Sequence, residues 1–183
     1  MTRWFEDIVE GDSFPLGSHT FTAEEIVRFG ALYDPQYFHI DPEAAKQSHF
    51  GGLVASGWHT VTPGHRKMVD AIFEEEERIR QAGGIPGVSG PSPGVNKMEF
   101  KAPVRPGDTV TYVLGVTGKR NSNSIPGWGL LFNELVATNQ RGELVYRAEL
   151  VSFPKLRDYK PPLGEKIAIA LTKVPLLRRL VRR

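Results

Sequence analysis

The spacing of apolar residues changes once along this chain, from a helical period to a period of two. Between about Gly57 and Arg80, apolar side chains recur at intervals of three and four residues, which predicts the longest helix of the chain. From Asn96 onwards they alternate with polar side chains, which is typical of strands with one buried face. We therefore expect an α+β fold, in which one long helix lies on a curved antiparallel sheet.

Turn residues divide the second half of the chain into strands. Strands are expected at 96–102, 110–116, 130–138 and 143–153, separated by a turn at 103–108, a loop at 118–129 and a hairpin turn at 139–142. A further short strand is expected around residues 17–21. Within the long helix, Pro63 leaves two alternatives open. Either the helix is kinked there, or it begins only at Thr62 as N-cap.

A shorter helix before residue 35 is marked at both of its ends. Thr22 is a candidate N-cap, and Glu25 three positions later completes a capping box. Pro35 disfavours helical backbone at the residue before it, so this helix should end at Asp34. The Asp-Pro pair at 41–42 then starts another short helix. Asp34 is therefore expected in irregular backbone between two helices.

Composition narrows the chemistry that is open to the chain. Its 183 residues suit one domain, and the absence of cysteine excludes disulfides, thiolate nucleophiles and cysteine metal sites. The N-terminus has no apolar signal segment and no run of about 18 apolar residues occurs, so we expect a cytoplasmic protein without a transmembrane helix. His49, His59 and His65 lack the spacing of metal ligands on one helix face, and we expect no metal site.

The basic residues are concentrated at the C-terminus. Six of them lie between Lys166 and Arg183 without an acidic residue, so the rest of the chain is net acidic although the whole carries a charge of +2. This distribution argues against a nucleic-acid-binding domain. We assign residues 1–160 to the domain and 161–183 to a basic, amphipathic tail. The tail either packs on the sheet or a second subunit, or contacts an anionic membrane surface.

Asp34 and His39 place a carboxylate and an imidazole five residues apart, and a helix start is expected at Gly57. An acid, a base and the N-terminus of a helix are the groups needed to activate water beside a carbonyl. Each has an ordinary alternative: Asp34 as a turn residue, His39 as a structural histidine, and Gly57 as a small residue at a helix start. Ser56 is either an N-cap or a part of the site.

Three segments resemble the MaoC-like dehydratases, a family that includes (R)-specific enoyl-CoA hydratases with a hot-dog fold. The segments are Asp-Pro-Gln-Tyr-Phe-His-Ile-Asp-Pro-Glu-Ala-Ala at 34–45, Phe-Gly-Gly-Leu-Val-Ala-Ser-Gly at 50–57 and Ala-Pro-Val-Arg-Pro-Gly-Asp-Thr at 102–109. They occur in the order found in the family, and the likeness covers roughly residues 10–155. The resemblance implies a single hot-dog domain, in which an antiparallel sheet wraps around a long central helix. It also implies a homodimer or a higher homo-oligomer.

The resemblance also implies roles for individual residues. The family's catalytic acid falls on Asp34, its histidine on His39, and its backbone oxyanion donor on Gly57. Candidate substrate-binding residues are Gln36, Gly52, Ser56 and Trp58. In many members of the family an asparagine stands where this chain has Gln36.

The activity implied is hydration of 2-enoyl-CoA, or dehydration of a 3-hydroxyacyl thioester. The expected ligand is an acyl-CoA or an acyl-carrier-protein thioester, with coenzyme A as part of the substrate and no separate cofactor. Lys97, Lys101 and Arg105 either meet phosphates of coenzyme A or lie on a solvated strand face. Two alternatives remain open at this stage: a hot-dog thioesterase, and a non-catalytic subunit that binds acyl thioesters.

Overall fold

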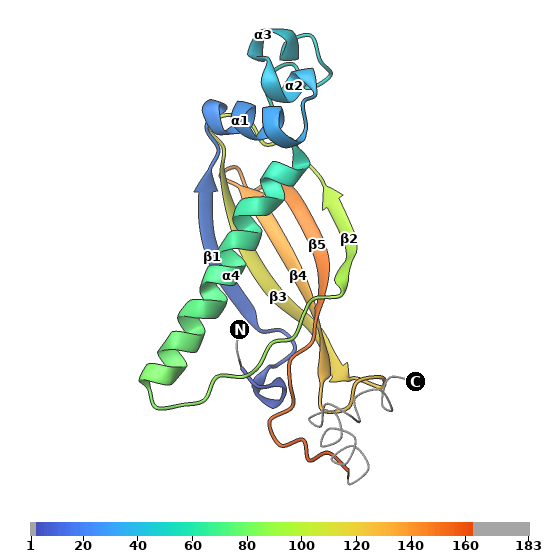
Figure 1. Ribbon diagram of the computed structural model, residues 1–183. Coiled ribbons are helices and arrows are strands. Elements are labelled where there is room, and N and C mark those ends of the chain that lie inside the picture. Colours follow the sequence, from blue (N-terminus) through green and yellow to red (C-terminus); the bar gives the residue numbers. More distant parts are fainter. Residues whose placement is uncertain (1–2, 163–183) are drawn as a thin grey trace, which may run out of the picture.

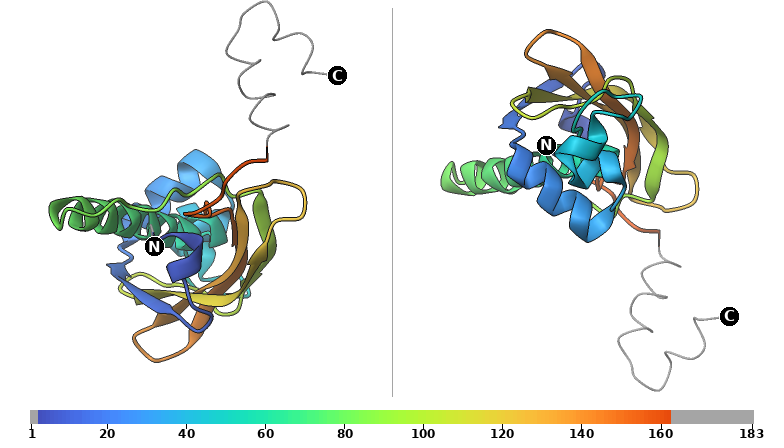
Figure 2. Two further views of the ribbon diagram at one scale, coloured as in Figure 1. Left: turned by 90° about the horizontal axis from the view of Figure 1, so that it is seen from below. Right: turned by 90° about the horizontal axis from the view of Figure 1, so that it is seen from above.

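The structure is a computed structural model that describes residues 3–162. A five-stranded antiparallel sheet curves around one long helix, α4 (Figures 1 and 2). This arrangement confirms the predicted α+β fold. The helices are η1 (Phe5–Asp7), α1 (Ala23–Tyr33), α2 (Tyr37–Ile40), α3 (Pro42–Ala45) and α4 (Gly57–Gln81). The strands are β1 (Ser13–Thr20), β2 (Gly94–Phe100), β3 (Thr109–Asn121), β4 (Gly129–Asn139) and β5 (Leu144–Ser152), in the spatial order β1-β3-β4-β5-β2.

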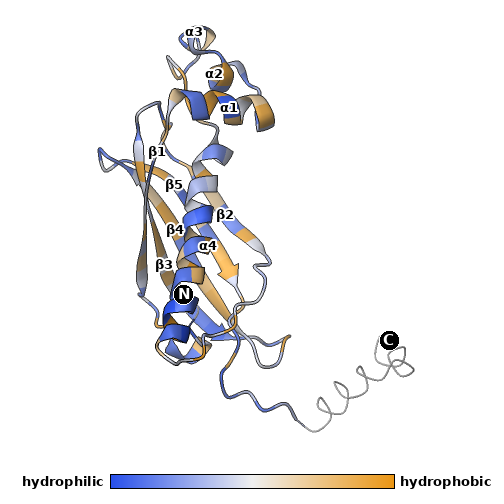
Figure 3. Cartoon of the chain, turned by 60° about the vertical axis from the view of Figure 1, so that its left-hand side comes forward, coloured by the Kyte–Doolittle hydropathy of each residue, from blue (hydrophilic) through white to orange (hydrophobic). Residues whose placement is uncertain are grey.

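Strand β4 lies at the centre of the sheet, and its residues alternate between buried and half-buried along the whole strand. The buried set includes Leu135 and Ala137, which join Tyr112 and Tyr146 in the main core. Apolar residues are more frequent in the sheet than in α4, which is largely polar (Figure 3). The sheet thus supplies most of the apolar surface, and burial of that surface against α4 is the main force that holds the two together.

Helix α4 continues through Pro63, so the alternative start at Thr62 is wrong. A proline at this position has no N–H for the carbonyl of His59, four residues earlier. The Thr62 hydroxyl takes over that role and donates to the His59 carbonyl at 3.1 Å. The next residue, Gly64, lies against the ring of Tyr112, and a Cβ there would approach the ring to 2.5 Å. Glycine is therefore required for this close contact between helix and sheet.

The local signals at the first helices are confirmed. Thr22 and Glu25 form the predicted capping box of α1, and Asp34 is its C-cap residue. Asp41 caps α3 and accepts hydrogen bonds from two backbone N–H groups. Two expectations were incomplete. The short helix α2 was not predicted, and β3 extends to Asn121, so the predicted loop at 118–129 begins later than expected.

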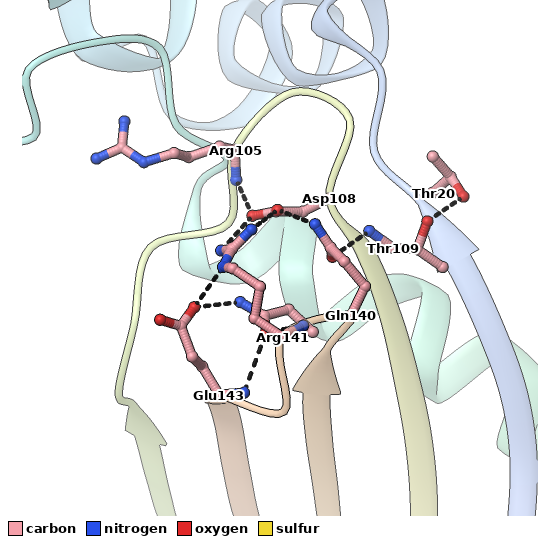
Figure 4. A network of polar contacts seen from close by, with 8 residues as sticks. Thr20, Arg105, Asp108, Thr109, Gln140, Arg141 and Glu143 are labelled. Carbon is pink, nitrogen blue, oxygen red and sulfur yellow. Dashed lines mark hydrogen bonds and ion pairs between the residues drawn. The ribbon is translucent and has the colours of Figure 1, made fainter.

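A buried carboxylate, Asp108, joins the turn before β3 to the β4–β5 hairpin (Figure 4). It accepts hydrogen bonds from Arg141, from Gln140 and from the backbone N–H of Arg105. These donors hold the pKa of Asp108 below its usual value, although burial acts in the opposite direction. The Arg105 side chain points away from this network in Figure 4 and donates to the Phe50 carbonyl at 2.7 Å. The network therefore anchors a turn that also holds the segment before α4.

The sequence predicted no transmembrane helix and a basic C-terminal tail. Within residues 3–162, no helix is both long and apolar enough to cross a membrane. The predicted basic tail lies almost entirely outside the described residues, so its contacts and the boundary at residue 160 remain predictions.

Candidate active site

Asp34 and His39 face each other at the end of the molecule where α1, α2 and the start of α4 meet. Their closest atoms, Asp34 Oδ2 and His39 Nε2, are 3.4 Å apart. The other ring nitrogen of His39, Nδ1, lies 2.7 Å from the Val54 carbonyl oxygen. Because a carbonyl oxygen only accepts, Nδ1 must carry a proton and donate it. This bond fixes the ring of the buried His39 and leaves Nε2 as the atom that faces Asp34.

The Asp34 carboxylate receives two further hydrogen bonds. The Ser56 hydroxyl donates to Oδ2 at 2.7 Å, and the Gln36 amide donates to Oδ1 at 2.9 Å. Partial burial raises the pKa of Asp34, but these two donors and the nearby His39 outweigh it and hold the pKa below its usual value. The carboxylate is therefore charged at neutral pH and is held in one orientation.

The start of α4 borders the same site. Ser56 occupies the N-cap position, yet its side chain makes no capping bond to the helix. The Thr60 N–H donates to the Ser56 carbonyl at 3.0 Å, which closes the first turn. The N–H groups of Gly57, Trp58 and His59 precede that turn and have no partner within the helix. They form the positive end of a helix of 25 residues, beside a charged carboxylate.

Gly57 is required here because Phe100 covers it. A Cβ at Gly57 would lie 2.7–2.8 Å from three ring carbons of Phe100. The ring belongs to the last residue of β2, so the helix start and the edge of the sheet approach each other at this glycine. The absence of a side chain lets the ring pack directly against the backbone of the first helical turn.

A pocket of about 420 Å³ lies between these elements. Six of the seven candidate site residues line it: Asp34, Gln36, His39, Ser56, Gly57 and Trp58. The seventh, Gly52, does not line it; a Cβ there would lie 3.6 Å from the Arg105 guanidinium. The structure thus brings together residues from two separate segments of the chain, 34–39 and 56–58. Their catalytic and binding roles remain predictions.

Sequence reasoning did not place several residues of this pocket. Phe38, Phe50 and Phe100 supply aromatic walls. Lys101, which the sequence had offered as a candidate contact to coenzyme A phosphates, also lines the pocket. Phe100 belongs to a predicted strand, but no local signal relates it to Gly57, 43 positions earlier. The Val54 carbonyl that orients His39 carries no sequence signal, since every residue has a carbonyl group. Within residues 3–162, no cluster of three or more potential metal ligands occurs.

A comparison with models of protein families shows to which family the chain belongs. The model described as the MaoC like domain matches residues 10–127, well over half of the chain. The chain belongs to the MaoC-like dehydratase family. The three motifs at 34–45, 50–57 and 102–109 all lie within the matched region, so the resemblance inferred from them is confirmed.

Individual relatives of this MaoC-like protein agree with the assignment. An uncharacterized Bacillus subtilis protein, YdeM, is 30% identical over 148 residues, which cover 79% of this chain and 94% of YdeM. An (R)-specific enoyl-CoA hydratase of Rhodospirillum rubrum is 34% identical over 121 residues, which cover 63% of this chain and 71% of that enzyme.

The crystal structure of a MaoC-like dehydratase from Rhodospirillum rubrum matches with a TM-score of 0.67 at 30% identity, covering 87% of this chain and 99% of that one. The predicted hot-dog arrangement of this MaoC-like protein is thereby confirmed.

Proposed function

We propose that this MaoC-like protein is an acyl-thioester hydratase or dehydratase that uses Asp34, His39 and the backbone N–H of Gly57. One observation carries the proposal: Asp34 Oδ2 and His39 Nε2 lie 3.4 Å apart in a pocket that also contains the N-terminus of α4. The related (R)-specific enoyl-CoA hydratase supports the same reaction class.

The proposed reaction uses the two side chains to hold one water molecule. With Nδ1 protonated, the neutral ring presents a lone pair at Nε2, and the Asp34 carboxylate presents another acceptor. A water molecule donates one hydrogen bond to each and directs its own lone pair at the substrate. As its oxygen bonds to the β-carbon of a 2-enoyl thioester, one of its protons passes to the pair. The pair then returns a proton to the α-carbon on the same face, which gives syn addition; dehydration runs through the same steps in reverse.

The start of α4 supplies the second requirement. As the water adds, negative charge builds on the thioester oxygen, and this charge needs a donor that is already in place. The Gly57 N–H is free of helix hydrogen bonds and lines the pocket. One such donor stabilises a developing oxyanion by about 2.7–4 kcal/mol. Ser56 serves as a positioning residue because its hydroxyl orients the Asp34 carboxylate.

The proposed substrate is an acyl-CoA or an acyl-carrier-protein thioester, handled in the cytoplasm. Candidate contacts beyond the catalytic groups are Gln36, Gly52, Ser56 and Trp58. Trp58 is 59% exposed and lies at the pocket, where its indole ring offers an apolar surface to the thioester arm. Lys101 is held by Glu99 at 2.7 Å, so its charge is partly neutralised.

We also infer a homodimer that forms through the edge strand β2. Among residues 3–162, no strand pairs with its outer edge, and its Val95 and Phe100 are 47% and 49% exposed. Antiparallel pairing with a second copy, centred on Met98, places Lys97 opposite Glu99 of that copy and avoids like charges. Glu99→Lys should weaken the dimer in sedimentation experiments, and the double variant Lys97→Glu/Glu99→Lys should restore it. A monomeric native protein would contradict this inference.

The activity is tested with crotonyl-CoA and longer 2-enoyl-CoA substrates. Loss of the conjugated absorbance without release of free thiol is the expected result. Release of free thiol would instead indicate a thioesterase, and binding without turnover would indicate a non-catalytic subunit; either result would reject the proposal.

A further inference from the structure

A second cavity of about 280 Å³ lies on the concave side of the sheet, beside the middle of α4. Its buried walls are apolar and include Ile8, Leu114, Val116 and Leu131. We call it the sheet chamber. None of the residues that line it also lines the Asp34–His39 pocket. The two are therefore separate spaces within one subunit.

The core of the protein separates the two spaces along α4. The active-site pocket meets the helix at Gly57 and Trp58, and the sheet chamber meets it from His65 onwards. Tyr112 contacts the stretch in between: its ring packs on Gly64, and its hydroxyl donates to the Thr60 carbonyl at 2.7 Å.

The sheet chamber contains a polar pair in its otherwise apolar wall. Asn133 is only 6% exposed and lies on the buried face of the central strand β4. Its amide nitrogen donates to the Leu131 carbonyl at 3.4 Å and to the Ser152 hydroxyl oxygen at 3.3 Å. The Leu131 carbonyl can only accept, which fixes which end of the amide is nitrogen. Both Asn133 and Ser152 line the chamber.

Asn133 and Ser152 each keep one hydrogen-bonding function without a partner in the described structure. None of the hydrogen bonds within residues 3–162 uses Asn133 Oδ1 as an acceptor or the Ser152 hydroxyl as a donor. Among residues 3–162, the fully enclosed side-chain atoms without a hydrogen-bond partner are His19 Nε2, His59 Nδ1 and Arg147 Nε, so Asn133 Oδ1 keeps accessible surface and can be reached by a ligand. The pair thus offers one acceptor and one donor side by side. A hydroxyl group is the simplest ligand group that satisfies both, because it donates and accepts at once.

We propose that the sheet chamber binds an aliphatic chain that carries a hydroxyl group. The chain lies against Leu114, Val116 and Leu131, and its hydroxyl donates to Asn133 Oδ1 and accepts from Ser152. This site does not depend on the reaction proposed for Asp34 and His39. The chain belongs either to a free hydroxylated amphiphile or to the acyl part of a thioester. A site built to hydrogen-bond a hydroxyl discriminates against the analogue that lacks it.

Calorimetric titration of the full chain with matched ligands tests the proposal. The free pair is octanoate and 8-hydroxyoctanoate, and the thioester pair is the coenzyme A derivatives of the same two acids. In at least one pair, the hydroxylated ligand should bind about threefold or more tightly, which corresponds to one net hydrogen bond. Preference in the free pair identifies a free amphiphile as the ligand, and preference confined to the thioester pair identifies an acyl chain. Equal binding within both pairs, or no binding, would overturn the proposal.

Variants locate the preference in the chamber. Asn133→Leu replaces the amide with an apolar group of similar size, so the preference for the hydroxyl should disappear while the plain chain still binds. Ser152→Ala removes only the donor and should reduce the preference; it also serves if Asn133→Leu fails to fold. Asn121→Leu, at the exposed end of β3, is the matched control and should bind like the native protein. Retention of the preference in both chamber variants would overturn the proposal. Since the readout is binding, it is independent of turnover at Asp34 and His39.

Discussion

The Ser56 hydroxyl donates a hydrogen bond to the Asp34 carboxylate at 2.7 Å, across 22 positions of the chain. Ser56 stands at the N-cap of α4, where a serine usually caps its own helix. Here its side chain is instead directed at the residue that ends α1. The helix start is thereby left without a side-chain cap, and the first N–H groups of α4 remain available next to the carboxylate.

Replacing Ser56 by alanine should therefore impair activity through Asp34. Loss of the donor raises the pKa of Asp34 and loosens its orientation, so the acidic limb of the pH–rate profile should move to higher pH. A hydrogen bond to a charged group contributes about 1.5–3 kcal/mol, and we expect kcat/KM to fall at least about 10-fold. Ser18→Ala is the control, since the Ser18 hydroxyl bonds the Thr111 hydroxyl between β1 and β3, outside the pocket. An unchanged profile in Ser56→Ala would remove its positioning role.

Asp34→Asn and His39→Gln should each lower the rate of enoyl-CoA hydration by about 100-fold or more, because each removes a proton acceptor for the water. Thermal unfolding should show that both variants still fold. Asp41→Asn is the control in the same segment: Asp41 caps α3, and asparagine caps a helix equally well. Near-native kcat in either pocket variant would exclude that residue from the chemistry.

Gly57→Ala should affect activity far more than stability. The added methyl group meets the ring of Phe100, which is 49% exposed and has room to turn away. The displaced ring and the methyl group then disturb the geometry at the start of α4, and we expect kcat to fall about 10–100-fold. The double variant Gly57→Ala/Phe100→Leu should recover part of the loss. Gly115→Ala, where the nearest atom is 4.0 Å away, should behave like the native protein in the same kinetic assay.

His59 predicts a pH dependence of stability. Its ring stacks on Phe29 at 4.6 Å, and burial lowers the pKa of His59 from 6.5 to about 4. As the pH falls, His59 therefore takes up a proton in the unfolded chain before it does so in the folded chain. The stability contributed by neutral His59 is complete above pH 6.5 and is lost progressively as the pH falls towards 4.

This loss amounts to roughly 3 kcal/mol in total. His59→Phe keeps an aromatic ring in the stack and should flatten the change in unfolding free energy over this pH range. Phe73→Leu, at an exposed aromatic residue of α4, should leave the pH dependence as it is. An identical slope in the native protein and in His59→Phe would contradict this explanation.

Local chemistry made much of the fold predictable. The capping box of Thr22 and Glu25, the helix end before Pro35 and the Asp41 cap each depend on residues within four positions, and all three are confirmed. The change of apolar period also separated the long helix from the strands. The motifs identified the family because they are short and contiguous. Local signals were not sufficient at Pro63, where a helix start at Thr62 was one of two alternatives. The helix continues through Pro63, and the Thr62 hydroxyl replaces the missing hydrogen bond.

The sequence by itself determined most of the elements, their order and the candidate pair of Asp34 and His39. Only the tertiary structure decided what these residues touch: Val54 orienting His39, Ser56 bonding Asp34, Phe100 covering Gly57, and Asn133 lying in an apolar wall. The physical reason is that secondary structure follows from side-chain period and backbone preferences over a few residues. Contacts between distant segments instead depend on how the sheet and α4 bury their apolar faces together, and no short stretch of sequence contains that information.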